Sequence, residues 1–194
     1  MKILFQGDGS SDDPGRLCPG ATGEETTDCH DLGEGYPRYA AVMFTDTYPD
    51  TEFTFYRDTA NGDVPDLVCF MPVFLGGESD EAYEAALAGR LSLFGDNEKT
   101  RVLLFEPFLA GEDHPEKRDF IDGRIAATRS AAAQRADVLV PLDGLFAAAR
   151  IAHPDIVYAD ENGLTPEGLC FLGECCLRAA APIVEAYLKN QETT

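Results

Sequence analysis

The chain has 194 residues, 44% of them hydrophobic, which suffices for one domain with a single packed core. Lys and Arg number 15 against 35 Asp and Glu, so the formal net charge is -20. Nucleic acids and anionic membranes attract cationic surfaces, so this charge argues against both as partners and leaves an unknown small molecule or protein.

The first residues do not resemble a signal peptide, because their apolar run stops at Phe5. A signal core needs roughly 7–15 apolar residues. No stretch approaches the roughly 18–20 apolar residues of a membrane span. We therefore expect a cytoplasmic protein with its cysteines as thiols. No motif indicates a cofactor, and no pattern defines the oligomeric state.

Apolar periodicity predicts alternating strands and helices along the chain. Continuous or alternating apolar runs predict strands at Lys2–Gln6, Thr51–Arg57, Leu67–Leu75, Val102–Phe105 and Val138–Pro141. Apolar residues at helical spacing predict helices at Tyr36–Tyr48, Asp80–Phe94, Asp119–Arg135, Leu142–Ile151 and Pro166–Leu188. Thr165 stands where the N-cap of the last helix is expected.

This alternation predicts an α/β fold, a three-layer α/β/α sandwich with a flavodoxin-like parallel sheet of about five strands. Residues 1–188 are expected to form a single domain, and residues 189–194 a polar C-terminal tail that frays. In such sheets ligands bind beyond the carboxyl ends of the strands. A site is therefore expected in the loops that follow the strands.

The segment from Asp8 to Gly35 is rich in Gly, Asp, Ser and Thr and is predicted to be a long loop. A zinc site there would use Cys18, Cys29 and His30, but the ligands are too few and too widely spaced, so ordinary thiols are favoured. A solvated acidic surface is favoured over a calcium site, since no EF-hand spacing joins Asp8, Asp12, Asp13, Asp28 and Asp31. Apolar or helical surroundings place four further cysteines in the core: Cys69, Cys170, Cys175 and Cys176.

Five stretches resemble the sequence blocks of one family, in the same order. They are ILFQGDG at 3–9, GEGYPRY at 33–39, LLFEPF at 103–108, VPLDGLF at 140–146 and DENGLTPEG at 160–168. Over nearly the whole chain they are similar to SGNH/GDSL hydrolases, the GDSL-like lipases, acylhydrolases and carbohydrate esterases. The resemblance implies the SGNH hydrolase fold, with the strand order 2-1-3-4-5.

The family's reaction, as the resemblance implies it, needs a serine nucleophile, a histidine base, an aspartate that orients the histidine, and N–H donors for the oxyanion. In this chain the nucleophile position is Gly9 and the base position is Gly163. Neither has a side chain that can attack or accept a proton. Asp160 keeps the place of the orienting aspartate.

The oxyanion donors also differ from the family's pattern. The second-block glycine falls on Asp58, whose carboxylate would repel a developing oxyanion. The third-block asparagine falls on Phe74 or on Glu78, depending on the alignment, and neither side chain donates a hydrogen bond. We therefore expect a catalytically inactive member of this lineage that acts as a binding or interaction module.

An alternative is an active hydrolase in which Ser10 or Ser11 has become the nucleophile. A serine nucleophile needs a base within hydrogen-bond reach. The sequence offers His30, His114 and His153, none of which stands at the base position. Surface or capping roles for these residues are the simpler interpretation.

The connection between the second and third predicted strands is short, running only from Thr59 to Pro65. Such a segment spans at most about 23–25 Å, which can carry a parallel crossover but leaves no room for a helix. The alternative is that this edge of the sheet is rebuilt.

Overall fold

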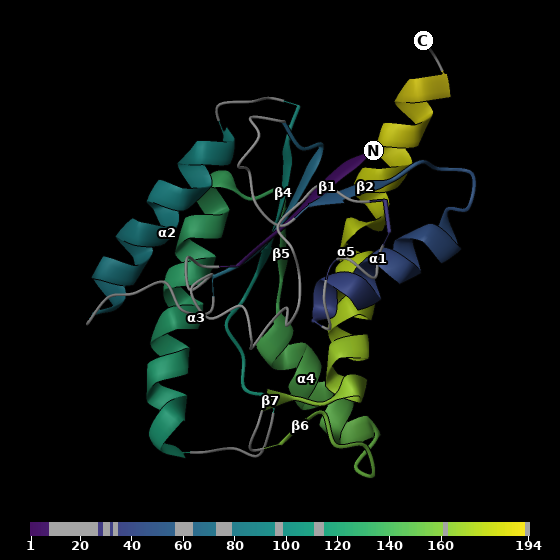
Figure 1. The fold of residues 1–194 in the computed structure, drawn as a ribbon. Helices are drawn as coiled ribbons and strands as arrows, with labels where there is room; N and C mark the ends of the chain where they lie inside the picture. Colours follow the sequence, from purple (N-terminus) through teal and green to yellow (C-terminus); the bar gives the residue numbers. More distant parts are fainter. Residues whose placement is uncertain are drawn as a thin grey trace.

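Five parallel strands form the centre of the molecule. The computed structural model describes residues 1–7, 27–28, 32, 35–56, 64–72, 79–95, 99–110, 115–160 and 163–192. Its main sheet has the order β2-β1-β3-β4-β5, between two groups of helices (Figure 1). The strands are β1 (Lys2–Gly7), β2 (Thr54–Tyr56), β3 (Leu67–Met71), β4 (Arg101–Phe105) and β5 (Val138–Val140). The predicted α/β/α fold and strand order are confirmed.

Helices cover both faces of the sheet, and each face has its own core. One face carries α1 (Tyr36–Thr47), α4 (Leu142–Ala152) and α5 (Pro166–Glu192), and the other carries α2 (Asp80–Gly95) and α3 (Pro115–Arg135). Successive strand residues point to opposite faces. The first core thus contains Phe5, Cys69 and Phe105, and the second contains Leu4, Val68 and Leu104. Burial on both faces explains the continuous apolar runs.

The edge formed by β2 is not rebuilt. Leu4 of β1 lies opposite Tyr56 of β2 on one side and Val68 of β3 on the other, and both pairings are parallel. β2 and β3 therefore flank β1, as a parallel crossover requires. Residues 57–63 of the connection lie outside the described part of the chain.

Several elements differ from their predicted bounds at the ends. β2 and β3 are shorter than predicted, and α3 begins at Pro115 instead of Asp119. α5 continues to Glu192, so the tail is helical up to that residue. Extending a formed helix adds a hydrogen bond without a new nucleation cost, and Lys, Gln and Glu are good helix formers. Long as α5 is, no helix in the described ranges is apolar enough over a sufficient length to cross a bilayer.

The four cysteines predicted in the core do not all lie there. Cys69, Cys175 and Cys176 are buried, but Cys170 is exposed on α5, so that prediction is wrong for Cys170. Cys176 Sγ donates to Cys69 Sγ at 3.7 Å, joining α5 to β3. This hydrogen bond, together with complete burial, raises the pKa of Cys176. Desolvation likewise raises the pKa of Cys175 to about 12. The buried cysteines act as neutral core residues.

Candidate functional site

The carboxyl ends of the strands are the expected location of a ligand in a parallel sheet. Most of the predicted site positions lie outside the described residues, namely Gly9, Ser10, Ser11, Asp58, Phe74 and Glu78. Asp160 and Gly163 are described, and lie in a hairpin on the side of the molecule where β5 ends (Figure 1). The described part of the site therefore consists of this hairpin and the exits of β4 and β5.

Asp160 and Gly163 face each other across the hairpin. Strand β6 (Ala159–Asp160) pairs antiparallel with β7 (Gly163–Leu164), and Asp160 is the direct partner of Gly163. Both residues are exposed. The structure thus brings together the two positions that the resemblance assigns to the orienting aspartate and the base. Because residue 163 is glycine, it has no imidazole ring that Asp160 could orient.

Gly163 has a backbone conformation that favours glycine. Its φ is +127°, and no non-glycine residue among those described has a positive φ. A Cβ built on Gly163 would meet no atom within 4 Å, so there is room for a side chain. The obstacle is the backbone, since residues with a Cβ rarely adopt this φ. Placing a histidine at 163 would therefore require a local change of the backbone as well.

The hairpin is held against the start of α5. The Thr165 backbone N–H donates to the Tyr158 carbonyl at 3.1 Å, and its hydroxyl donates to the Val157 carbonyl at 2.6 Å. The Gly168 N–H donates to Thr165 Oγ1 at 3.1 Å, which confirms the predicted N-cap. A Cβ on Gly168 would lie 2.0 Å from the Tyr158 carbonyl oxygen, so only glycine permits this close approach. These contacts fix the position of the hairpin strands that contain Asp160 and Gly163.

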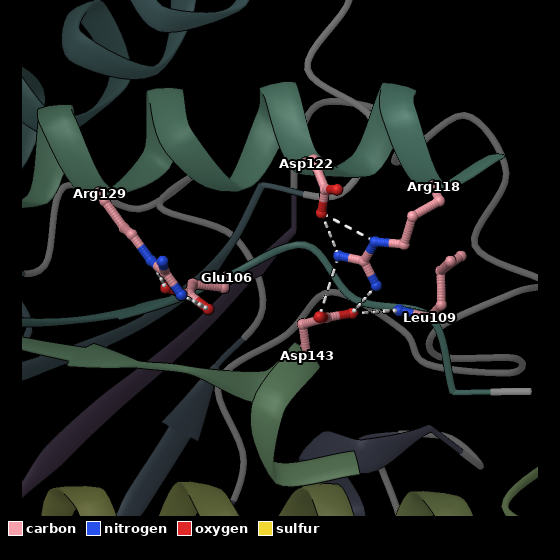
Figure 2. A network of polar contacts seen from close by, with 6 residues as sticks. All are labelled: Glu106, Leu109, Arg118, Asp122, Arg129 and Asp143. Carbon is pink, nitrogen blue, oxygen red and sulfur yellow. Dashed lines mark hydrogen bonds and ion pairs between the residues drawn. The ribbon is translucent and has the colours of Figure 1, made fainter. Parts of the chain in front are cut away.

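A buried carboxylate lies at the exit of β4. Glu106 follows the strand directly, is 0% exposed, and donates its N–H to the Val140 carbonyl at 3.0 Å. From α3, Arg129 donates through Nε to Glu106 Oε1 at 2.6 Å and through Nη2 to Oε2 at 3.4 Å (Figure 2). The hydrogen bond to Glu106 raises the pKa of Arg129. The charge of Glu106 is therefore balanced by an arginine reaching in from the surface.

A second cluster of ion pairs lies at the exit of β5. Asp143, in the first turn of α4, accepts from Arg118 Nη1 at 3.1 Å and Nη2 at 3.0 Å, and from the Leu109 N–H at 3.3 Å (Figure 2). Arg118 also donates to Asp122 one turn along α3. Hydrogen bonds to Asp122 and Asp143 raise the pKa of Arg118. The cluster joins α3, α4 and the loop after β4.

These two clusters have no signature in the sequence that pairs each carboxylate with its arginine. Glu106 and Asp143 were recognised only as members of strand-exit motifs, and their arginine partners were unassigned. The available signal was an acidic residue within three positions of the end of a buried apolar strand, since a buried charge needs a partner. Both carboxylates already accept hydrogen bonds from guanidinium groups, so this part of the edge is built for stable geometry and not for proton transfer.

Of the three histidines, His153 is the one that the described ranges include. It is exposed, follows the last turn of α4, and donates its N–H to the Ala149 carbonyl at 2.8 Å. His30 and His114 are outside the described residues, as are Cys18 and Cys29. Within the described ranges no group of three or more His, Cys, Asp or Glu side chains is placed to hold a metal ion. The loop residues that could have supplied zinc or calcium ligands, a role the sequence already disfavours, lie outside these ranges, except Asp28.

Solved structures share this architecture. A protein described as a GDSL-like lipase from Parabacteroides merdae superposes with a TM-score of 0.73 at 19% identity, covering 93% of this chain and 95% of that one. Axe2, an acetylxylan esterase from Geobacillus stearothermophilus, gives 0.70 at 20% identity, covering 92% and 93%. LAE5, an α/β hydrolase from the metagenome of Lake Arreo, gives 0.70 at 17% identity, covering 94% and 95%.

No family model and no curated protein matches the chain. The structural matches nevertheless extend over nearly its whole length and include lipases, acylhydrolases and an acetylxylan esterase. The chain therefore has the SGNH/GDSL hydrolase-like fold, as its sequence blocks imply.

Proposed function

We propose that this protein is a non-hydrolytic member of the SGNH/GDSL esterase lineage and acts as a binding or interaction module. The observation that carries the proposal is Gly163, which stands opposite Asp160 in the hairpin and has a φ of +127°. The base position thus lacks an imidazole and has a backbone that disfavours one. Asp160 remains, but it has no ring to orient.

The remaining positions support the same conclusion through their chemistry. By resemblance the nucleophile position is Gly9, which has no oxygen to attack an ester carbonyl. Loss of one triad member leaves a residual rate of only about 10³–10⁴-fold over water. Asp58 at an oxyanion-donor position would lower this further, since losing one donor costs about 10²–10³ in rate. With the nucleophile, the base and the oxyanion donors all lost, no residue at these positions would assist any step of ester cleavage.

One of the similar solved structures offers a useful comparison. It is a catalytic mutant of Axe2 in which a histidine was replaced by alanine. In the present chain the position matching the family's histidine already holds glycine. This supports the view that the chain lacks what the esterase needs, while keeping the fold that surrounds the site.

The competing function is a serine hydrolase with Ser10 or Ser11 as the nucleophile. A fluorophosphonate probe distinguishes the two, because it labels only activated serines. We expect no stoichiometric labelling of the wild-type chain, with Axe2 labelled in parallel as the positive control. Labelling that disappears in Ser10→Ala or Ser11→Ala would establish the competing function.

The binding part of the proposal has its own test. An acetylated xylo-oligosaccharide is the first ligand to try, because Axe2 is an acetylxylan esterase with the same fold. Isothermal titration should detect binding of this ligand without release of acetate, and weaker binding of the deacetylated oligosaccharide. Equal affinity for both forms, or none for either, would contradict recognition of the acylated ligand at this site.

A further inference from the structure

A groove lies between α4 and α5. Its volume is about 780 Å³, and neither Asp160 nor Gly163 is among its lining residues. Much of its lining is apolar and comes from both helices and the segment between them, including Leu145, Ala148, Ala152, Ile156, Cys170 and Phe171. The groove adjoins the base of the hairpin through Tyr158 and Pro166 but does not include Asp160 or Gly163, so what it binds does not depend on the proposed function.

Exposed apolar side chains gather beside this groove. Ile151 is 83% exposed, Ile156 36% and Val157 62%, and all three lie in one short stretch at the end of α4. Elsewhere, the exposed large apolar residues in the described ranges are scattered: Val42, Val64, Leu93 and Phe120. Ile156 lines the groove, and Ile151 and Val157 are its near neighbours in the chain. Exposed apolar side chains that cluster beside a groove are characteristic of an interaction surface.

The charged groups around the groove are predominantly acidic. Glu167 and Glu174 line it, and exposed Asp155 stands between two lining residues, His153 and Ile156. The one arginine in the lining, Arg178, donates to Glu174 at 2.6 Å, so these two charges balance each other and Glu167 and Asp155 supply the negative charge of the rim. With a net charge of -20 over the whole chain, this rim favours a cationic partner.

The dimensions of the groove suit a helix. Its lining residues on α5 extend from Pro166 to Arg178, which at 1.5 Å per residue is about 18 Å. In helix-in-groove recognition, an amphipathic helix lays its apolar face into a hydrophobic groove. The helix inserts residues spaced i, i+3, i+4 and i+7, and here α4 and α5 would form the two walls of the groove. We propose that this groove binds the apolar face of a basic amphipathic helix from another protein.

A pair of synthetic peptides tests this proposal. The first places leucines at i, i+3, i+4 and i+7 with lysines elsewhere, and the second has the same composition with the pattern scrambled. Fluorescence anisotropy should show the patterned peptide binding about tenfold or more tightly, equivalent to about 1.4 kcal/mol. Equal affinities would mean that only charge attracts the peptides, and would overturn the proposal.

Two matched variants locate the binding. Ala148→Gln fills the groove from an exposed position on α4 without changing the charge, and Ala88→Gln makes the same change at an exposed position on α2, on the other face of the sheet. Ala148→Gln should weaken the patterned peptide at least fivefold, whereas Ala88→Gln should leave it unchanged. Equal effects, or no effect of Ala148→Gln with circular dichroism as in the wild type, would overturn the proposal.

The alkylation rate of Cys170 reports on occupancy of the groove, because this exposed cysteine is one of its lining residues. Alkylation by iodoacetamide, followed at Cys170 by peptide mass spectrometry, should slow when the patterned peptide is bound. Unchanged alkylation at saturating peptide would overturn the proposal. So would protection of Cys170 by protein concentration alone with a doubled mass in light scattering, since the occupant would then be a second copy of this chain.

Discussion

The hairpin of β6 and β7 and the exits of β4 and β5 both belong to the candidate site, but they differ in burial and in ion pairing. In the hairpin, Asp160 and Gly163 are exposed, and the base position is defined by its backbone alone. At the strand exits, Glu106 is fully buried and Asp143 mostly so, and both are bound by arginines from α3. The ion pairs thus hold elements of the fold together, whereas Asp160 and Gly163, where we propose that the hydrolytic machinery has been lost, are exposed.

This difference indicates which features of the site the fold itself requires. Ion pairs at the exits of β4 and β5 hold α3 against the edge of the sheet, so their loss should destabilise the protein whether or not a ligand binds. The hairpin needs glycine at 163 only for its own backbone conformation. Substitutions in the two regions should therefore differ in size and in cause.

The largest effect is expected from Arg129→Ala. Glu106 would lose the arginine that balances its charge while remaining 0% exposed. Breaking a buried ion pair from one side costs about 3–5 kcal/mol, and we expect the lower end because Arg129 is itself 60% exposed. Chemical denaturation at pH 7 measures this loss. Arg101→Ala, which breaks an exposed pair with Asp137, is the matched control and should cost at most about 1 kcal/mol. Similar losses in the two variants would show that the pair at Glu106 is an ordinary surface interaction.

A smaller loss is expected from Gly163→Ala. A side chain at a φ of +127° strains the backbone, at a cost of about 1–3 kcal/mol. Gly89→Ala makes the same change at an exposed position inside α2, where a new Cβ meets nothing within 4 Å. That control should gain about 0.5–1 kcal/mol, because alanine is the better helix former. If Gly163→Ala is neutral or stabilising, the backbone does not explain the glycine.

Removal of the N-cap should cost somewhat less. Thr165→Ala loses the hydroxyl that bridges the Val157 carbonyl and the Gly168 N–H. Replacing a capping threonine costs typically about 1 kcal/mol. Thr45→Ala removes a hydroxyl that donates back to the Ala41 and Val42 carbonyls within α1, so it should change the melting temperature little. Equal changes in melting temperature would argue against a capping role.

The smallest effect concerns acid stability. The hydrogen bond from Arg118 lowers the pKa of Asp122 below its ordinary value of 3.8. A lowered pKa in the folded state stabilises the protein above the unfolded value, and this contribution disappears as the pH falls through the folded pKa. Asp122→Asn should therefore melt slightly earlier than the wild type at pH 7, with the difference shrinking below about pH 4. A carboxyl NMR titration that places Asp122 at or above 3.8 would contradict the pairing.

Much of the fold could be predicted from the sequence because burial on both faces leaves a strong signal. β3 is an unbroken apolar run, and Thr165 stands where an N-cap must be. The hairpin of β6 and β7 could not be predicted, since two-residue strands are too short to show a period. The extension of α5 to Glu192 was missed because polar residues at a chain end suit a helix and a frayed tail equally.

The candidate site was harder to predict. Asp160 and Gly163 are direct partners in the pairing of β6 with β7, and their closeness in sequence makes such a pairing easy to anticipate. The ion-pair partner of Glu106 is Arg129 on α3, and no local sequence pattern predicts a pairing between residues of different elements. The conformation of Gly163 is also invisible in sequence, since glycine is compatible with any φ. Cys170 was misplaced because its neighbours on α5, Cys175 and Cys176, do face the core.

The central claim, that the SGNH/GDSL hydrolase-like fold persists here without ester hydrolysis, is tested most directly by acetate release from an acetylated xylo-oligosaccharide. Axe2 assayed under the same conditions is the positive control. We predict that the folded wild-type chain releases acetate no faster than the same protein after heat denaturation. Release that is faster, is proportional to protein concentration and is abolished by Ser10→Ala or Ser11→Ala would contradict the account and define an active hydrolase.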